Sequence, residues 1–190
     1  MSRMSFALSH TARRCAALFA LVAVAIATPT PATAQTTEEA IKEAFLADLE
    51  TMQGKFLGLA EAFPADTYTW RPMDGVRSVS EVLMLIANEG YGFVPNAFGG
   101  QPALGQEESQ ALSSVADKAQ VIDHLTKAFA HAKAQVEAVD PATLTGTRPF
   151  FGQDMTTPQI VGFVAGDMHE HLGQLIAYAR SNEVVPPWSQ

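Results

Sequence analysis

Apolar residues recur at steps of three and four in four separate segments of this 190-residue chain, and this spacing sets narrow limits on its fold. Such spacing places the apolar side chains along one face of an α-helix. The segments lie at 37–63, 78–94, 114–139 and 157–185, and each stops at or just before a proline. N-capping signals open three of them, at Thr36 or Thr37, at Ser78 with Glu81, and at Thr157 with Pro158. We therefore predict four amphipathic helices.

The connections between these segments are long, covering 63–77, 96–113 and 140–156. The stretch 96–113 is rich in Gly, Pro, Gln and Ser, and we expect a mobile loop there. No segment has the alternating pattern of a strand, so no sheet is predicted. Helices of this kind bury their apolar stripes most simply against one another. The predicted fold is all-α, an irregular four-helix bundle with long inter-helix loops.

Residues 1–34 have the order of parts found in a secretory signal peptide. Basic residues come first, then an uncharged apolar run at 15–27, then Ala32-Thr33-Ala34 ahead of Gln35. The apolar run is shorter than the roughly 20 residues that span a bilayer. We expect cleavage after Ala34, export to the periplasm or the exterior, and no stable membrane insertion afterwards. The alternative is an uncleaved membrane anchor. The bundle domain is expected at 35–190.

The charge and the cysteine content limit which partners the protein can bind and which side chains can serve as nucleophiles or metal ligands. Asp and Glu number 20 against 12 Lys and Arg, for a net charge of −8, and the leader contains none of the acidic residues. This acidic balance argues against nucleic acid as a partner. The single cysteine, Cys15, lies in the leader, so the remaining chain has no disulfide, thiol nucleophile or thiolate metal site. Any metal ion there must be bound by His, Asp or Glu.

The apolar stripe of the fourth segment is interrupted by two polar residues. Asp167 and His171 fall on the stripe that begins at Ile160, so they are expected to share one inward face. A buried charge without a partner is costly, so this pair must hydrogen-bond, hold a metal or line a wet cavity. His169 and Glu170 point elsewhere and are interpreted as solvated surface residues.

Glu89 interrupts the second segment in the same way. If the second and fourth helices pack side by side, Glu89, Asp167 and His171 form a mixed nitrogen and oxygen site suited to a divalent ion. The spacing alone favours a structural hydrogen bond between Asp167 and His171, because buried polar groups usually find protein partners. Both interpretations stay open at this point. His124 and His131 flank the apolar stripe of the third segment and indicate no site.

Three stretches resemble the DinB-like (YfiT-like) superfamily of metalloenzymes. They are Trp70-Arg71-Pro72 with 75–82 leading into the second helix, Phe150-Phe151-Gly152 ahead of the fourth, and 171–180 (HLGQLIAYAR) running toward Pro186-Pro187. The resemblance covers nearly all of the chain beyond residue 34. It implies a four-helix bundle, often dimeric, with a divalent ion such as nickel or zinc at one end. The family's ligands are typically three histidines, one from the second helix and two spaced four apart on the fourth.

The chain departs from that histidine set. The family's ligand positions fall on His171, Asp167 and Leu85, so one histidine of three is kept. Leu85 cannot bind a metal, and Glu89, one turn further along, is the local replacement. The resemblance therefore implies a degenerate metal site with His171, Asp167 and Glu89 as candidate ligands.

Two functions follow as hypotheses, and the sequence leaves open whether the protein is an enzyme. The first is an exported DinB-like domain of unassigned molecular activity, whose degenerate site serves as a small-molecule pocket or an interaction surface. The second is a divalent-metal-dependent hydrolase or thiol-transferase-like enzyme using Asp167 and His171. Export disfavours thiol transfer, because it removes the protein from the cytosolic thiol pool. A third possibility is a purely structural dimer, in which the apolar faces of the first and fourth helices pack against a second copy. A homodimer and a small-molecule ligand are the expected partners.

Overall fold

The computed structural model describes residues 35–189, so the predicted signal peptide at 1–34 lies outside the described residues. The described chain is mostly helical. The helices are α1 (Thr37–Ala62), α2 (Val79–Asn88), a π-helical turn (Glu89–Phe93), α3 (Val94–Ala97), α4 (Gln106–Ala111), α5 (Lys118–Ala138) and α6 (Thr157–Ser181). Short 3₁₀ turns lie at Ala65–Thr67, Leu112–Ser114, Pro141–Leu144 and Pro187–Ser189, and two strands, β1 (Thr147–Phe150) and β2 (Gln153–Thr156), precede α6. None of the described helices has the length and apolar character needed to cross a bilayer.

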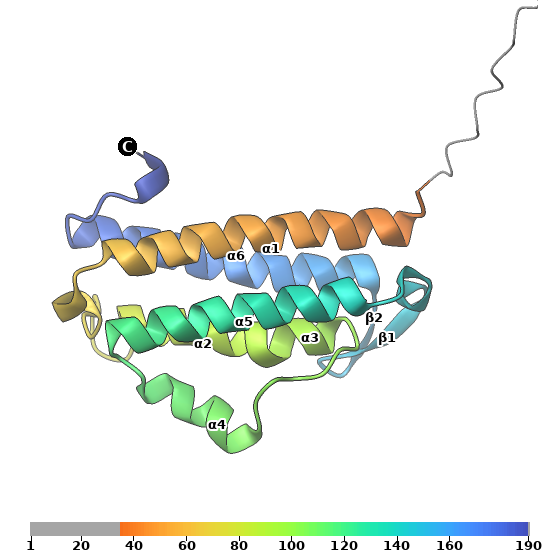
Figure 1. The fold of residues 1–190 in the computed structure, drawn as a ribbon, viewed down its shortest axis with the longest axis horizontal. Coiled ribbons are helices and arrows are strands. Elements are labelled where there is room, and N and C mark those ends of the chain that lie inside the picture. Colours follow the sequence, from red (N-terminus) through yellow and green to blue (C-terminus); the bar gives the residue numbers. More distant parts are fainter. Residues whose placement is uncertain (1–34, 190) are drawn as a thin grey trace, which may run out of the picture. The chain divides into compact units, whose positions relative to one another are not determined.

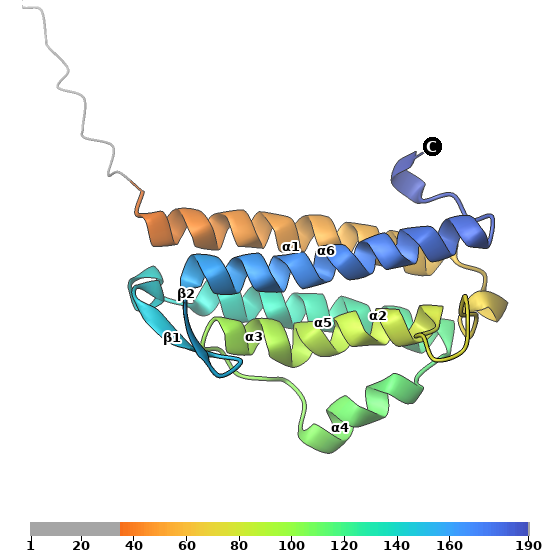
Figure 2. The ribbon, with the colours of Figure 1, turned by 180° about the vertical axis from the view of Figure 1, so that it is seen from behind.

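The longest helices pack around one apolar core (Figure 1). Helix α1 contacts α5 and α6, and α2 contacts the same two helices (Figure 2). Each helix contributes fully buried side chains from its predicted apolar stripe, among them Phe56, Leu83, Leu125 and Leu175. Helix α4 lies outside this group of helices, beside α2 in both views. The predominantly helical fold agrees with the prediction from apolar spacing.

Side-chain caps fix where the long helices begin. The Thr36 hydroxyl accepts from the Glu39 amide, and the Glu39 carboxylate accepts from the Thr36 amide. Ser78 and Glu81 form the same reciprocal pair at α2, as predicted. Two starting points differ from the sequence interpretation by a few residues. Helix α5 begins after the N-cap Asp117 and not at Ser114, and the N-cap of α6 is Thr156 and not Thr157.

Pro95 does not end the second helix, which corrects the sequence prediction. The chain passes from α2 through the π-helical turn directly into α3, and Pro95 occupies the first turn of α3. Pro95 lacks the N–H that would continue the helical hydrogen bonds, and this gap falls directly after the π-helical turn, where the hydrogen-bond register already changes. The π-helical turn shifts the hydrogen-bond register, with the Val94 amide donating to the Glu89 carbonyl. Its Gly90 lies so close to α5 that a Cβ would stand 3.0 Å from the backbone of Ala128.

Two predicted loops contain regular structure. The stretch 140–156 forms an antiparallel hairpin, with Phe150 paired to Gln153 across a turn of Phe151 and Gly152. Both turn residues have positive φ, 48° and 75°, as in the tight turns that match the twist of a hairpin. The stretch 96–113 contains α4, whose Ser109 hydroxyl donates to the Asn88 side chain at 2.5 Å. Both elements are too short and polar to give a periodic signal.

Candidate metal centre

Glu89, Asp167 and His171 lie together where the end of α2 faces α6. One potential ligand atom from each residue lies within 4.8 Å of the other two. Glu89 is the first residue of the π-helical turn, while Asp167 and His171 are one turn apart on α6. The Asp167 Oδ1 to His171 Nε2 distance is 3.9 Å, which is too long for a hydrogen bond. The structural Asp–His hydrogen bond that spacing favoured is therefore absent, and that interpretation is wrong.

Glu89 is a buried acid without a full set of partners. Its relative exposure is 7%, and no hydrogen-bond partner among the described residues reaches its Oε2. Burial raises the pKa of Glu89 to about 9, a side-chain hydrogen bond to Asp167 and the charge of that carboxylate add to the rise, and Arg77 opposes it. At neutral pH the side chain therefore carries a proton unless a cation lies beside it.

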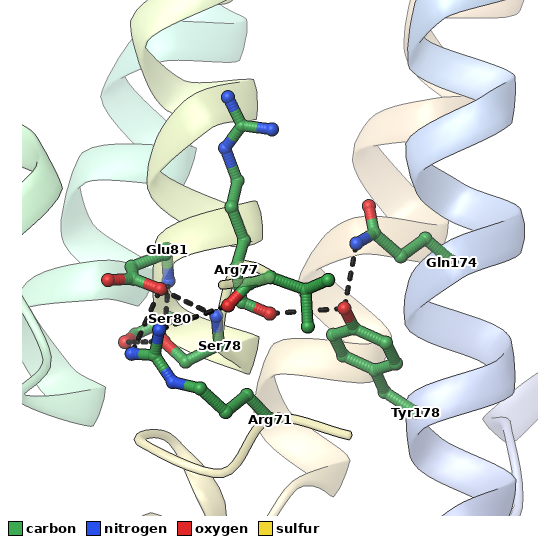
Figure 3. A network of polar contacts seen from close by, with 8 residues as sticks. Arg71, Arg77, Ser78, Ser80, Glu81, Gln174 and Tyr178 are labelled. Atoms are coloured by element: carbon green, nitrogen blue, oxygen red, sulfur yellow. Dashed lines mark hydrogen bonds and ion pairs between the residues drawn. The ribbon is translucent and has the colours of Figure 1, made fainter. Parts of the chain in front are cut away.

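The ring of His171 is held by a relay of hydrogen bonds along α6. Its Nδ1 lies 3.0 Å from Gln174 Oε1, and Gln174 Nε2 lies 2.8 Å from the Tyr178 hydroxyl. The Tyr178 hydroxyl in turn lies 3.0 Å from the carbonyl oxygen of Arg77, just before α2 (Figure 3). Arg77 precedes Ser78, whose capping box with Glu81 holds this end of α2. The relay therefore ties α6 to the start of α2.

The direction of this relay determines which ring nitrogen carries the proton. A carbonyl oxygen only accepts, so the Tyr178 hydroxyl donates to Arg77 and accepts from the amide nitrogen of Gln174. The amide oxygen of Gln174 then faces His171, and only a protonated Nδ1 can donate to it. In a neutral imidazole this leaves the lone pair on Nε2, the nitrogen that faces Asp167. Metal-binding histidines are oriented in the same way by a partner on their other nitrogen.

The donor set fits a divalent cation. It offers one imidazole nitrogen and two carboxylates, one of which has a buried oxygen without a partner. Mixed imidazole and carboxylate sets suit zinc, nickel, iron and manganese. A cation would compensate the Glu89 charge, whose burial is otherwise unfavourable. Leu85 supplies no ligand, and it lines a separate hollow of about 380 Å³ with Arg71 and Arg77.

The other three histidines of residues 35–189 have partners elsewhere. His169, expected to be solvated, is half-exposed and its Nε2 lies 2.9 Å from the Asp48 carboxylate of α1. His124 lies 3.3 Å from the Tyr91 hydroxyl. His131 contacts the Gln101 carbonyl at 2.9 Å. None of these belongs to the cluster on α2 and α6.

Sequence reasoning missed two groups around the site. Gln174 lies three residues after His171 on α6, and Tyr178 lies four residues after Gln174. Residues at these steps share one face of a helix, so the spacing alone could have indicated this group. The second group comprises Phe151 and Phe163, which line a hollow of about 280 Å³ together with Phe93, Glu89 and Asp167. Their meeting depends on the hairpin, which no sequence signal indicated.

A comparison with models of protein families bears on this cluster. A family model described as the DinB superfamily matches residues 48–175, which include Glu89, Asp167 and His171. No curated protein matches the chain significantly.

Proposed function

The chain belongs to the DinB superfamily, and on that premise we propose that its helices form the family's four-helix bundle and hold a divalent ion through Glu89, Asp167 and His171. The packing of α1 and α2 on both α5 and α6 around one core supports the bundle. The observation that carries the ion site is the meeting of three ligand atoms, within 4.8 Å of one another, at the buried carboxyl group of Glu89.

Each residue has a distinct role in this proposal. His171 presents the Nε2 lone pair, since Gln174 occupies its Nδ1. Asp167 supplies a carboxylate oxygen from the preceding turn of α6. Without an ion Glu89 keeps its proton, because an uncompensated charge is unfavourable at this depth. A bound cation would compensate the charge, so Glu89 would release its proton to solvent. A bound ion would supply Lewis acidity to a small molecule in the hollow beside Glu89 and Asp167.

Metal analysis of the whole protein tests the proposal. Protein purified without chelator, or reloaded with zinc or nickel after chelation, is expected to hold one ion per chain by mass spectrometry. His171→Ala should lose the ion. His169→Ala is the matched control, because this histidine lies on the same helix but contacts Asp48. Retention of the ion by His171→Ala, or its absence from the unsubstituted protein, would refute the site.

Proton release gives a second, independent measurement. At pH 7 the folded protein should release about one proton from Glu89 for each ion bound, because its pKa is about 9 without the ion. Calorimetric titrations in buffers of different ionisation enthalpy measure this number. Glu89→Gln should bind the ion more weakly and without this proton. An equal proton count in both proteins would contradict the role assigned to Glu89.

A further inference from the structure

Four phenylalanines meet beside the candidate ion site. Phe93 comes from the π-helical turn, Phe150 and Phe151 from the hairpin, and Phe163 from α6. Their ring centroids lie between 4.8 Å and 6.3 Å apart, with Phe150 and Phe151 the closest pair. We call these four residues the aromatic cluster. Phe151 is 70% exposed and Phe163 is 47% exposed, so the cluster offers apolar surface to solvent.

Three residues of the aromatic cluster line one hollow together with two of the three candidate ligands. Phe93, Phe151 and Phe163 form its aromatic part, and Glu89 and Asp167 form its acidic part. A grouped apolar surface beside a few polar groups is the usual composition of a small-molecule site.

The backbone at Phe151 is unusual for such a bulky residue. Its φ of 48° lies in the left-handed region, where hairpin turns favour Asn or Gly. Burial does not compensate this strain, because the ring is largely exposed. Strained residues of this kind gather at binding and catalytic sites. The chain therefore keeps a strained phenylalanine at a position where its ring packs on Phe150 and Phe163 and still faces solvent.

We propose that the aromatic cluster binds the apolar ring of a small organic molecule whose single polar head reaches the ion held by Glu89, Asp167 and His171. This inference rests on the proposed function. The hollow, at about 280 Å³, lies near the lower limit of small-molecule pockets, so it fits one ring with a short head. Neither Lys nor Arg lines this hollow, which disfavours phosphorylated or polyanionic ligands. The ligand class is a monocyclic aromatic compound with one metal-binding group.

Two hydroxamates with the same metal-binding head test whether the protein prefers an aromatic ring. Benzohydroxamate carries an aromatic ring and acetohydroxamate carries a methyl group, so the ratio of their affinities measures the contribution of the aromatic cluster. We call this ratio the ring preference. Zinc-loaded protein is expected to bind benzohydroxamate at least about tenfold more tightly by calorimetry, because ring burial adds apolar contact. Zinc analysis after each titration verifies that the ion stays bound.

Phe151→Asn and Phe163→Ala should each reduce the ring preference severalfold while leaving the zinc content unchanged. Asparagine suits the turn at position 151, so loss of folding is not the expected consequence. Trp188→Ala is the matched control, since Trp188 is an exposed aromatic outside the cluster. It should keep the full ring preference.

The outcomes separate the two proposals. Stoichiometric zinc with equal binding of both hydroxamates overturns the inference and leaves the proposed ion site standing. A ring preference that survives both phenylalanine substitutions also overturns it. If the protein binds no zinc, the proposed function fails, and the metal-free protein is titrated with benzyl alcohol by NMR. Shifts at the cluster that Phe151→Asn abolishes would then support the aromatic subsite, and their absence would overturn it.

Discussion

The buried Glu89 should make the stability of the metal-free protein fall as pH rises. Its folded pKa of about 9 lies above the ordinary value of 4.5, so between these values the folded chain holds a proton that the unfolded chain has lost. The folded state therefore binds more protons, and the free energy of unfolding decreases with pH over this interval. The contribution is fully present below about pH 4.5 and is lost as pH approaches 9.

The magnitude follows from the same two pKa values. Each pH unit in this interval changes the free energy of unfolding by about 1.4 kcal/mol. Between pH 5 and pH 7 the metal-free protein should thus lose about 3 kcal/mol relative to Glu89→Gln, whose neutral amide has a similar shape and does not titrate. For a domain of this size that difference corresponds to roughly 6 to 12 °C in Tm.

Thermal and urea denaturation at pH 5, 6, 7 and 8, with chelator present, measure this effect. The difference in free energy between Glu89→Gln and the unsubstituted protein should grow in favour of the variant as pH rises. Glu170→Gln, which removes an exposed carboxyl on α6 without reaching the buried site, is the matched control. Stability curves of Glu89→Gln and the unsubstituted protein that run parallel from pH 5 to pH 8 would refute the reasoning.

Two further substitutions test the relay and the helix packing. Tyr178→Phe removes the hydroxyl that orients Gln174, so the folded variant should bind zinc about tenfold more weakly through His171. Calorimetry measures this affinity, and an unchanged value would contradict the relay. Gly90→Ala places a Cβ 3.0 Å from the backbone of Ala128 and should cost about 1 to 3 kcal/mol in denaturation experiments, while a change below about 0.5 kcal/mol would show that α5 can move aside.

The long helices were predictable because their signals are local. Caps such as Ser78 with Glu81, and apolar stripes at steps of three and four, act within one helix, and neighbouring elements did not override them. Pro95 misled the prediction because a proline is ambiguous: it ends one helix but suits the first turn of another. The hairpin was missed because strands of four residues give no reliable alternation, and its turn carries Phe151 where Asn would have been a signal.

The sequence predicted which residues form the candidate site but not the distances between them. Polar residues in the predicted apolar stripes of two helices identified Glu89, Asp167 and His171, and the structure brings all three together. On α6, however, Met168 and Leu172 form the buried face, and Asp167 and His171 lie partly buried beside it. The relation among them was not available, because a distance of 3.9 Å between Asp167 and His171 depends on rotamers and not on spacing. The aromatic cluster was also beyond reach, since its members come from three elements separated along the sequence.

The proposed ligand set and the aromatic cluster are connected through the course of α2. The resemblance places a family ligand at Leu85, and the proposal uses Glu89, a displacement of four residues or about 6 Å along the helix axis. That displacement is toward the hairpin, because α2 leads through the π-helical turn into α3, and α3 and β2 both contact α6. On α6, Asp167 lies on the hairpin side of His171. In the proposed site a cation between Glu89 and Asp167 would therefore lie beside Phe151 and Phe163, so one site would use both the acidic ligands and the strained aromatic turn.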